Sequence, residues 1–86
     1  MAAVNFSIKV VDENGYSISD ARIYLYRTPL LDPWHDTQYT DSDGWANCEY
    51  DDCFGCESVS LGIEINGDNL GEHMFYDGST KSFTLS

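Results

Sequence analysis

Positive charge is what this chain has least of. Four lysines and arginines stand against fifteen aspartates and glutamates, which gives a formal net charge of −11 at pH 7. Such a surface repels the phosphates of nucleic acids and the headgroups of anionic membranes, so we expect neither as a partner. Two interpretations of the charge stay open: solubility, including adaptation to high salt, or attraction for cations and basic partners.

Long apolar segments are also missing. No apolar run approaches the length of roughly 18 residues that a membrane span needs. The N-terminal residues contain neither a basic region nor a long apolar segment, so no signal peptide is visible. The compartment stays open between a cytoplasmic protein, a protein whose leader was removed, and a domain of a longer, extracellular or particle-associated protein.

Helical periodicity is the third absence, because apolar residues nowhere recur at helical spacing over three turns. They alternate with polar residues instead, most regularly from Val59 to Ile65, and this alternation predicts strands. We expect strands over residues 4–10, 21–26, 37–40, 45–50, 59–65, 72–76 and 81–85. The length of 86 residues and the hydrophobic content of 42 % fit a single domain over residues 1–86. The sequence therefore predicts an all-β fold, a single seven-stranded antiparallel β-sandwich.

The aromatic side chains mark a candidate contact surface. Pro29 and Pro33 remove backbone donors, so residues 28–35 are expected to form a loop. Our predicted contact surface consists of the loop 28–36 together with Tyr24, Tyr26, Trp34 and Trp45. Outward aromatic side chains favour a surface for protein or sugar. The alternative is that these rings cover the edges of a small core.

Two motifs resemble a known group of domains. Residues 10–25 contain Asp12-Glu13-Asn14-Gly15, then a spacer and Ala21-Arg22-Ile23-Tyr24-Leu25, while Thr40-Asp41-Ser42-Asp43-Gly44 forms a second motif. This pair of motifs resembles carboxypeptidase-regulatory-like and transthyretin-like domains. The resemblance implies a transthyretin/prealbumin-like, Ig-like sandwich. It also implies a structural, adhesive or docking module in a larger or surface-exposed assembly.

The chemistry known among similar domains is not expected here. Transthyretin-like hydrolases of hydroxyisourate carry a C-terminal Tyr-Arg-Gly-Ser and paired histidines, whereas this chain ends Ser82-Phe83-Thr84-Leu85-Ser86 and has only His35 and His73. Collagen-adhesin B-type domains form a Lys–Asn isopeptide bond inside the core, but Lys9 falls on the outward parity of its strand. Neither histidine lies in a nucleophile–base motif, and no glycine-rich phosphate loop occurs, so we expect no enzyme.

Three cysteines supply the candidate metal ligands. Cys48, Cys53 and Cys56, completed by His35 or His73, would offer the donors of a tetrahedral zinc site. The alternatives stay open: Cys48 as a small buried residue, and Cys53 with Cys56 as a disulfide or as free thiols. The odd number also permits a bridge between chains.

Calcium is the other candidate cation. Asp41-x-Asp43-Gly44 resembles the start of an oxygen-ligand loop, but the twelfth position is Asp52 rather than glutamate. The turn shared with the resembling domains explains Asp41 and Asp43 without a metal.

The sequence thus predicts a non-catalytic structural or protein-interaction module without a cofactor. It would associate with itself or dock to a larger surface or particle-associated assembly. One alternative is a module that binds zinc or calcium at the segment Cys48 to Glu57. A weaker alternative is a carbohydrate-binding module that uses the exposed aromatic residues.

Overall fold

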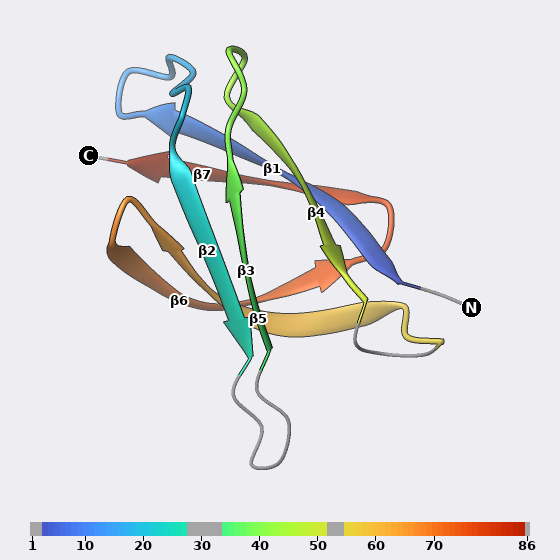
Figure 1. Cartoon of the computed structure of the whole chain (residues 1–86). Coiled ribbons are helices and arrows are strands. Elements are labelled where there is room, and N and C mark those ends of the chain that lie inside the picture. Colours follow the sequence, from blue (N-terminus) through green and yellow to red (C-terminus); the bar gives the residue numbers. More distant parts are fainter. Residues whose placement is uncertain (1–2, 28–33, 52–54, 86) are drawn as a thin grey trace.

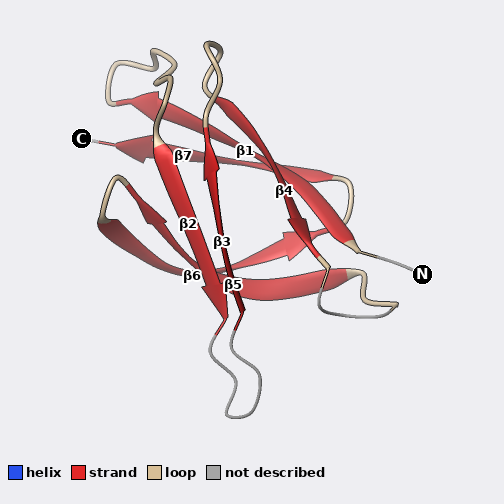
Figure 2. Cartoon of the chain, in the orientation of Figure 1, coloured by secondary structure: helices blue, strands red, loops and turns tan. Residues whose placement is uncertain are grey.

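The described part of the chain is made of strands and turns. The computed structural model describes residues 3–27, 34–51 and 55–85, and no helix occurs in these ranges (Figure 2). Their strands are β1 (Val4–Asp12), β2 (Arg22–Arg27), β3 (Trp34–Tyr39), β4 (Trp45–Tyr50), β5 (Ser58–Ile65), β6 (Asp68–Tyr76) and β7 (Ser79–Leu85). The predicted all-β class is confirmed. The described ranges accordingly hold no helix long and apolar enough to cross a membrane.

The strands form two sheets in a β-sandwich-like arrangement (Figure 1). Sheet A has the order β4-β1-β7 and sheet B the order β3-β2-β5-β6. Sheet B is antiparallel, but β1 runs antiparallel to β4 and parallel to β7, so sheet A is mixed. The prediction of a purely antiparallel fold was wrong at this point.

The turn between β6 and β7 explains the parallel pair. It passes from sheet B to sheet A instead of closing a hairpin, and β1 holds it in place. The backbone N–H of Asn5 donates to Asp77 Oδ1 (2.9 Å), and the N–H of Gly78 donates to the Asn5 carbonyl (2.7 Å). The last strand therefore enters sheet A at the start of β1 and runs in the same direction.

One hydrophobic core lies between the sheets. Alternate residues of the long strands point into it, as the sequence predicts, and the buried members from β1 and β5 are Val4, Phe6, Ile8, Val10, Val59, Leu61, Ile63 and Ile65. The rings of Phe6 and Phe75 stack across the core from opposite sheets, with centroids 4.4 Å apart. Lys9 has the opposite parity and places its Nζ 5.1 Å from the centroid of the Trp45 ring.

Two strands begin three or more residues earlier than predicted. β3 starts at Trp34, so residues 34–36 belong to a strand and not to the predicted loop; residues 28–33 lie outside the described ranges. A proline restricts the residue before it and not the one after it, which allows a strand to begin directly behind Pro33. β6 starts at Asp68 because Asn66 and Gly67, both at positive φ, form a two-residue hairpin turn that begins pairing at once.

The two Asp-x-x-Gly motifs fold into the same turn. Oδ1 of Asp12 and Oδ1 of Asp41 each accept hydrogen bonds of 2.8 to 3.0 Å from the backbone N–H groups two and four residues later. In each turn the glycine, Gly15 or Gly44, donates its N–H to the carbonyl of that aspartate and has a positive φ (87° and 81°). Both turns thus depend on a carboxylate and a glycine at fixed spacing.

Candidate functional site

Tyrosine side chains gather on the outward side of sheet B. Tyr24 and Tyr26 lie on β2, opposite in parity to the buried Ile23 and Leu25, and their ring centroids are 5.8 Å apart in a stacked arrangement. His35 of the neighbouring strand β3 stacks on Tyr24 at 6.1 Å. The sequence prediction that both tyrosines point outward is therefore consistent with their place in the sheet.

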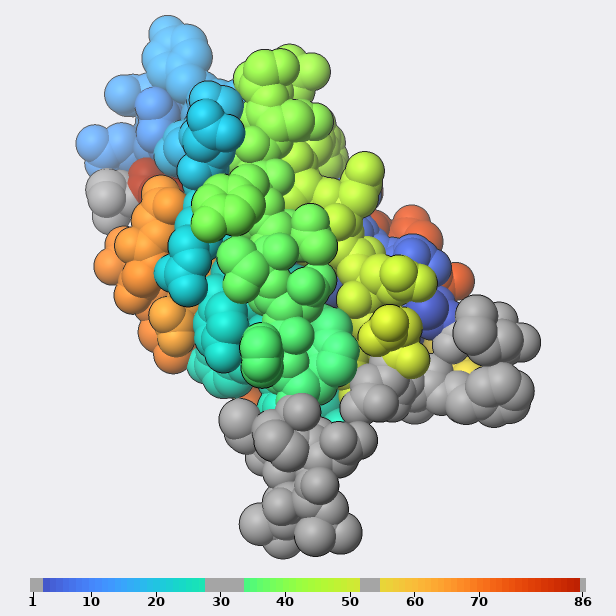
Figure 3. All heavy atoms as spheres, viewed as in Figure 1, coloured from blue at the N-terminus to red at the C-terminus, as the bar shows by residue number. Residues whose placement is uncertain are grey.

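The register of β3 adds a further tyrosine to this surface. Tyr39 lies opposite Arg22, has the outward parity, and is 60 % exposed. We call Tyr24, Tyr26, His35 and Tyr39 the tyrosine face. Figure 3 shows the side of the molecule on which β2 and β3 lie in front of β1 and β7, and their side chains (cyan to green) cover its middle. Sequence reasoning missed His35 because it began the third strand at residue 37. It missed Tyr39, which lay inside the predicted strand, because the register of β3 against β2 is known only from the structure.

Tyr26 is held in place from two directions. Its hydroxyl accepts a hydrogen bond of 3.0 Å from Asn69 Nδ2 on β6. Its ring lies over Gly62, its cross-strand partner on β5, so closely that a Cβ on Gly62 would collide with it. An aromatic ring over a strand glycine covers backbone that would otherwise be open to water. Tyr26 thus has a structural role, whereas Tyr24 contacts Tyr26, His35 and the Arg22 guanidinium through its ring.

The two tryptophans lie away from the tyrosine face. Trp34 has the inward parity of β3 and packs against the core, with its ring edge-on to Tyr50 at a centroid distance of 4.8 Å. Trp45 lies on β4, in the other sheet, under the ammonium group of Lys9. The predicted set of Tyr24, Tyr26, Trp34 and Trp45 is therefore divided among three places, and only the two tyrosines are brought together.

The different packing of the tryptophans predicts different effects of their removal. We expect Trp34→Ala to lower the free energy of unfolding by about 2 kcal/mol, because the half-buried ring loses its contact with Tyr50 and the core. Trp45→Ala should cost less than about 1 kcal/mol, since its ring lies on the outer side of sheet A. Urea unfolding followed by circular dichroism measures both. Equal losses would contradict this placement of the rings.

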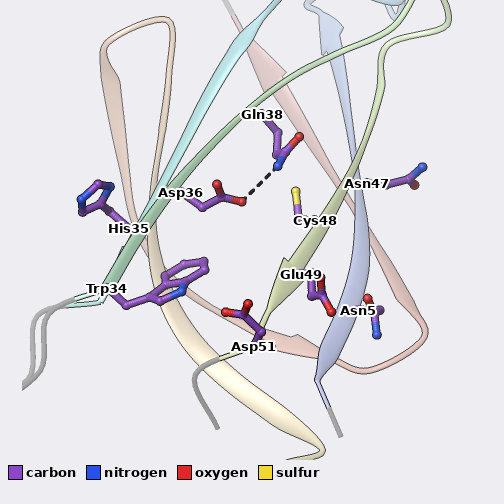
Figure 4. Close-up of a pocket in the computed structure, with 9 residues that line it drawn as sticks. All are labelled: Asn5, Trp34, His35, Asp36, Gln38, Asn47, Cys48, Glu49 and Asp51. Atoms are coloured by element: carbon purple, nitrogen blue, oxygen red, sulfur yellow. Dashed lines mark hydrogen bonds between the residues drawn. The ribbon is translucent and has the colours of Figure 1, made fainter.

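A groove of about 510 Å³ separates β3 from β4. Its lining residues are Asn5, Trp34, His35, Asp36, Gln38, Asn47, Cys48, Glu49 and Asp51 (Figure 4). Three of these are carboxylates and none is a lysine or arginine. Asp36 accepts a hydrogen bond of 3.0 Å from Gln38 Nε2 on the same strand. The groove is thus a polar, acidic opening between the edge strands of the two sheets.

The Cys48 thiol lies at the base of this groove and is a poor nucleophile. The residue is buried and its thiol is free. Burial, and to a lesser extent the nearby Asp36 carboxylate, raises the pKa of Cys48 to about 12 from the ordinary value of 9.0. Since the thiolate is the reactive form, the side chain is unreactive at neutral pH. This agrees with the interpretation of Cys48 as a small buried residue.

The raised pKa of Cys48 also predicts a pH dependence of stability. The unfolded chain releases the thiol proton near pH 9 and the folded chain only near 12, so the folded state binds one more proton between these values. The free energy of unfolding should therefore fall as pH rises above about 9, by about 1.4 kcal/mol per pH unit from this group. Urea titrations from neutral to alkaline pH should show a shallower decline for Cys48→Ala than for the natural sequence. Parallel declines would contradict the prediction.

The described residues assemble no metal centre around the cysteines. Cys56 is disulfide-bonded, so its sulfur is not a thiolate ligand in this state, and Cys53 lies outside the described residues. Over residues 3–27, 34–51 and 55–85, no group of three or more histidine, cysteine, aspartate or glutamate side chains is placed to hold a metal ion. Asp41, the first candidate calcium ligand, accepts hydrogen bonds from the backbone N–H groups of Trp45 and Asp43 within its own turn. These hydrogen bonds lower the pKa of its carboxyl.

Comparisons with known proteins add no family assignment. No model of a known protein family matches the chain, and no curated protein is significantly similar to it in sequence. The function therefore has to be argued from the surfaces described above.

Proposed function

We propose that this protein is a non-catalytic protein-interaction module, of the transthyretin or carboxypeptidase-regulatory type of β-sandwich, that uses the tyrosine face as its contact surface. The observation that carries the proposal is the stacked pair Tyr24–Tyr26 on the outward side of β2. The outward side of an antiparallel sheet is ordinarily polar. Tyrosines are enriched at protein interfaces because they combine a large apolar ring with a hydrogen-bonding hydroxyl.

The positions of the titratable groups support a non-catalytic role. Cys48 keeps its thiol protonated at neutral pH, and the two histidines lie on opposite sides of sheet B. His35 belongs to the tyrosine face, whereas His73 packs its ring against Phe83 at 5.0 Å and contacts the Leu70 carbonyl through Nε2 (3.0 Å). These side chains have structural contacts and form no nucleophile–base pair with one another.

The carbohydrate-binding alternative ranks below protein binding. Sugars bind against open faces of aromatic rings, but the Tyr24 ring is in stacked contact with both Tyr26 and His35. The partner we propose is a protein, either a second copy of the chain or a component of a larger assembly. The tyrosine face carries charges of both signs, because the Arg22 guanidinium lies 5.8 Å from the centroid of the Tyr24 ring and Glu64 lies opposite Tyr24 on β5.

Native mass spectrometry of the untagged protein, with and without reducing agent and chelator, tests the class of function. A metal-free species is expected, with a disulfide mass deficit that reduction removes. A monomer that carries zinc or calcium until the chelator is added would contradict the proposal and place the function in the segment Cys48 to Glu57.

Sedimentation of a Tyr24→Thr variant tests the surface. The substitution keeps a residue that favours strands and leaves the Tyr26 ring over Gly62 in place. The matched control is Tyr16→Thr, which removes an exposed tyrosine from a turn. Loss of association in Tyr24→Thr but not in Tyr16→Thr supports the tyrosine face as the contact surface. Equal association of both variants and the natural sequence contradicts it.

A further inference from the structure

The free edge of β3 is open along the groove. β3 ends sheet B and β4 ends sheet A, and neither has a strand neighbour on this side among the described residues. The two strands are joined by the turn 40–44 and diverge away from it, and Trp34 and Asp51 line the end of the groove that is far from this turn (Figures 1 and 4). An unpaired strand edge beside a groove is the geometry into which extended peptides add as a further strand.

The side chains of β3 distinguish its edge from that of β4. The inward-pointing residues of β4 are Ala46, Cys48 and Tyr50, all buried in the core. The inward-pointing residues of β3 are Trp34, Asp36 and Gln38, which are only half-buried and line the groove. A strand added beside β3 would place its own alternate side chains next to this row.

We propose that the groove binds an extended segment of a partner protein that carries arginine or lysine at alternate positions and pairs with the free edge of β3. The inward side chains of such a segment would face the Asp36 carboxylate of β3, while Asp51 and the exposed Glu49 line the groove on the β4 side. The lining contains no cation that already neutralises these groups. The Trp34 ring, which lines the groove at the end far from the turn 40–44, offers an aromatic wall for a guanidinium group.

This inference rests on the proposed function in one respect, that the protein binds other proteins, but it uses a different surface. Asp36 has an alternative explanation, because a charge that points inward from an edge strand protects that edge from unwanted pairing. Under that explanation Asp36 keeps strands away, and its removal would increase association. Under our proposal Asp36 selects a cationic strand, and its removal weakens binding.

The test uses a short synthetic peptide in which arginine alternates with threonine, titrated into isotope-labelled full-length protein. We expect the largest amide chemical-shift changes on β3, and slower hydrogen exchange of its amides. Asp36→Asn should weaken binding about tenfold, the effect of losing one charge-assisted contact. The matched control, Glu64→Gln, removes a half-buried carboxylate from the outward side of sheet B and should leave the affinity unchanged.

Several outcomes would overturn the inference. These are no binding, shifts spread evenly over the acidic surface, or equal weakening by Asp36→Asn and Glu64→Gln, which would indicate non-specific attraction. Undiminished peptide binding by an Asp36→Asn variant that aggregates would identify Asp36 as edge protection only. The Tyr24→Thr variant separates the two proposals. If it binds the peptide normally but the tyrosine face proves unused, the inference stands while the proposed contact surface fails.

Discussion

Gly44→Ala is expected to lower the free energy of unfolding by about 3 kcal/mol, a large part of the stability of a domain of this size. Two effects combine at this position. Gly44 has a φ of 81°, a conformation that an alanine adopts only with strain. A Cβ built there would also lie 2.8 Å from the Val10 carbonyl oxygen and 3.0 Å from Ser17 Cβ.

The Val10 carbonyl is not free to move aside. It accepts a hydrogen bond of 3.0 Å from the N–H of Ile18, while the N–H of Val10 donates to the Gly44 carbonyl at 2.9 Å. These bonds link the two Asp-x-x-Gly turns across the end of the molecule. Relief of the clash would therefore require displacement of β1 or loss of the contact between the turns.

Gly15→Ala provides the matched control. Gly15 occupies the same place in the other turn and has a φ of 87°, but a Cβ there would meet nothing within 4 Å. Its substitution should cost only the conformational strain, about 1 kcal/mol. Thermal and urea unfolding of the two variants separate the contributions. If both variants lose the same free energy of unfolding, the contact between the turns does not contribute measurably to stability.

Much of the fold was predictable because alternation and turn chemistry are local properties. The apolar positions of β1 and β5, and the hairpin at Asn66 and Gly67, follow directly from residue order. The parallel pairing of β7 with β1 did not follow, because it depends on Asn5 holding the turn at Asp77 and Gly78 from the far end of the sequence. Such a contact leaves no periodic signal.

The candidate surfaces were predictable only in part for the same reason. The parity of Tyr24 and Tyr26 within β2 identifies them as outward from sequence alone. Trp34 was assigned to a loop, and its packing on Tyr50 arises from a contact between the edges of different sheets. The groove beside it is likewise a property of two sheets that diverge, and no single stretch of sequence encodes it.

Thr40→Val is expected to destabilise the protein by a similar amount, about 3 kcal/mol, although it preserves the shape of the side chain. Thr40 directly follows β3 and is a buried polar residue, 2 % exposed. Its Oγ1 accepts a hydrogen bond of 2.8 Å from the N–H of Ala21 and donates one of 2.6 Å to the Ile18 carbonyl. Valine would leave both backbone groups without their side-chain partner, and the N–H of Ala21 is buried.

Thr40→Ser separates the contribution of the hydroxyl to stability from that of the methyl group. Serine keeps both hydrogen bonds and loses only one buried methyl, so it should cost about 1 kcal/mol. For a domain of this size the difference between the variants corresponds to a melting temperature roughly 10 °C lower for Thr40→Val than for Thr40→Ser. The reverse order would mean that Thr40 acts through packing. The expected order would show that the first residue of the Thr-Asp-x-Asp-Gly motif joins the two turn regions by hydrogen bonding, which gives that position a physical reason independent of any family.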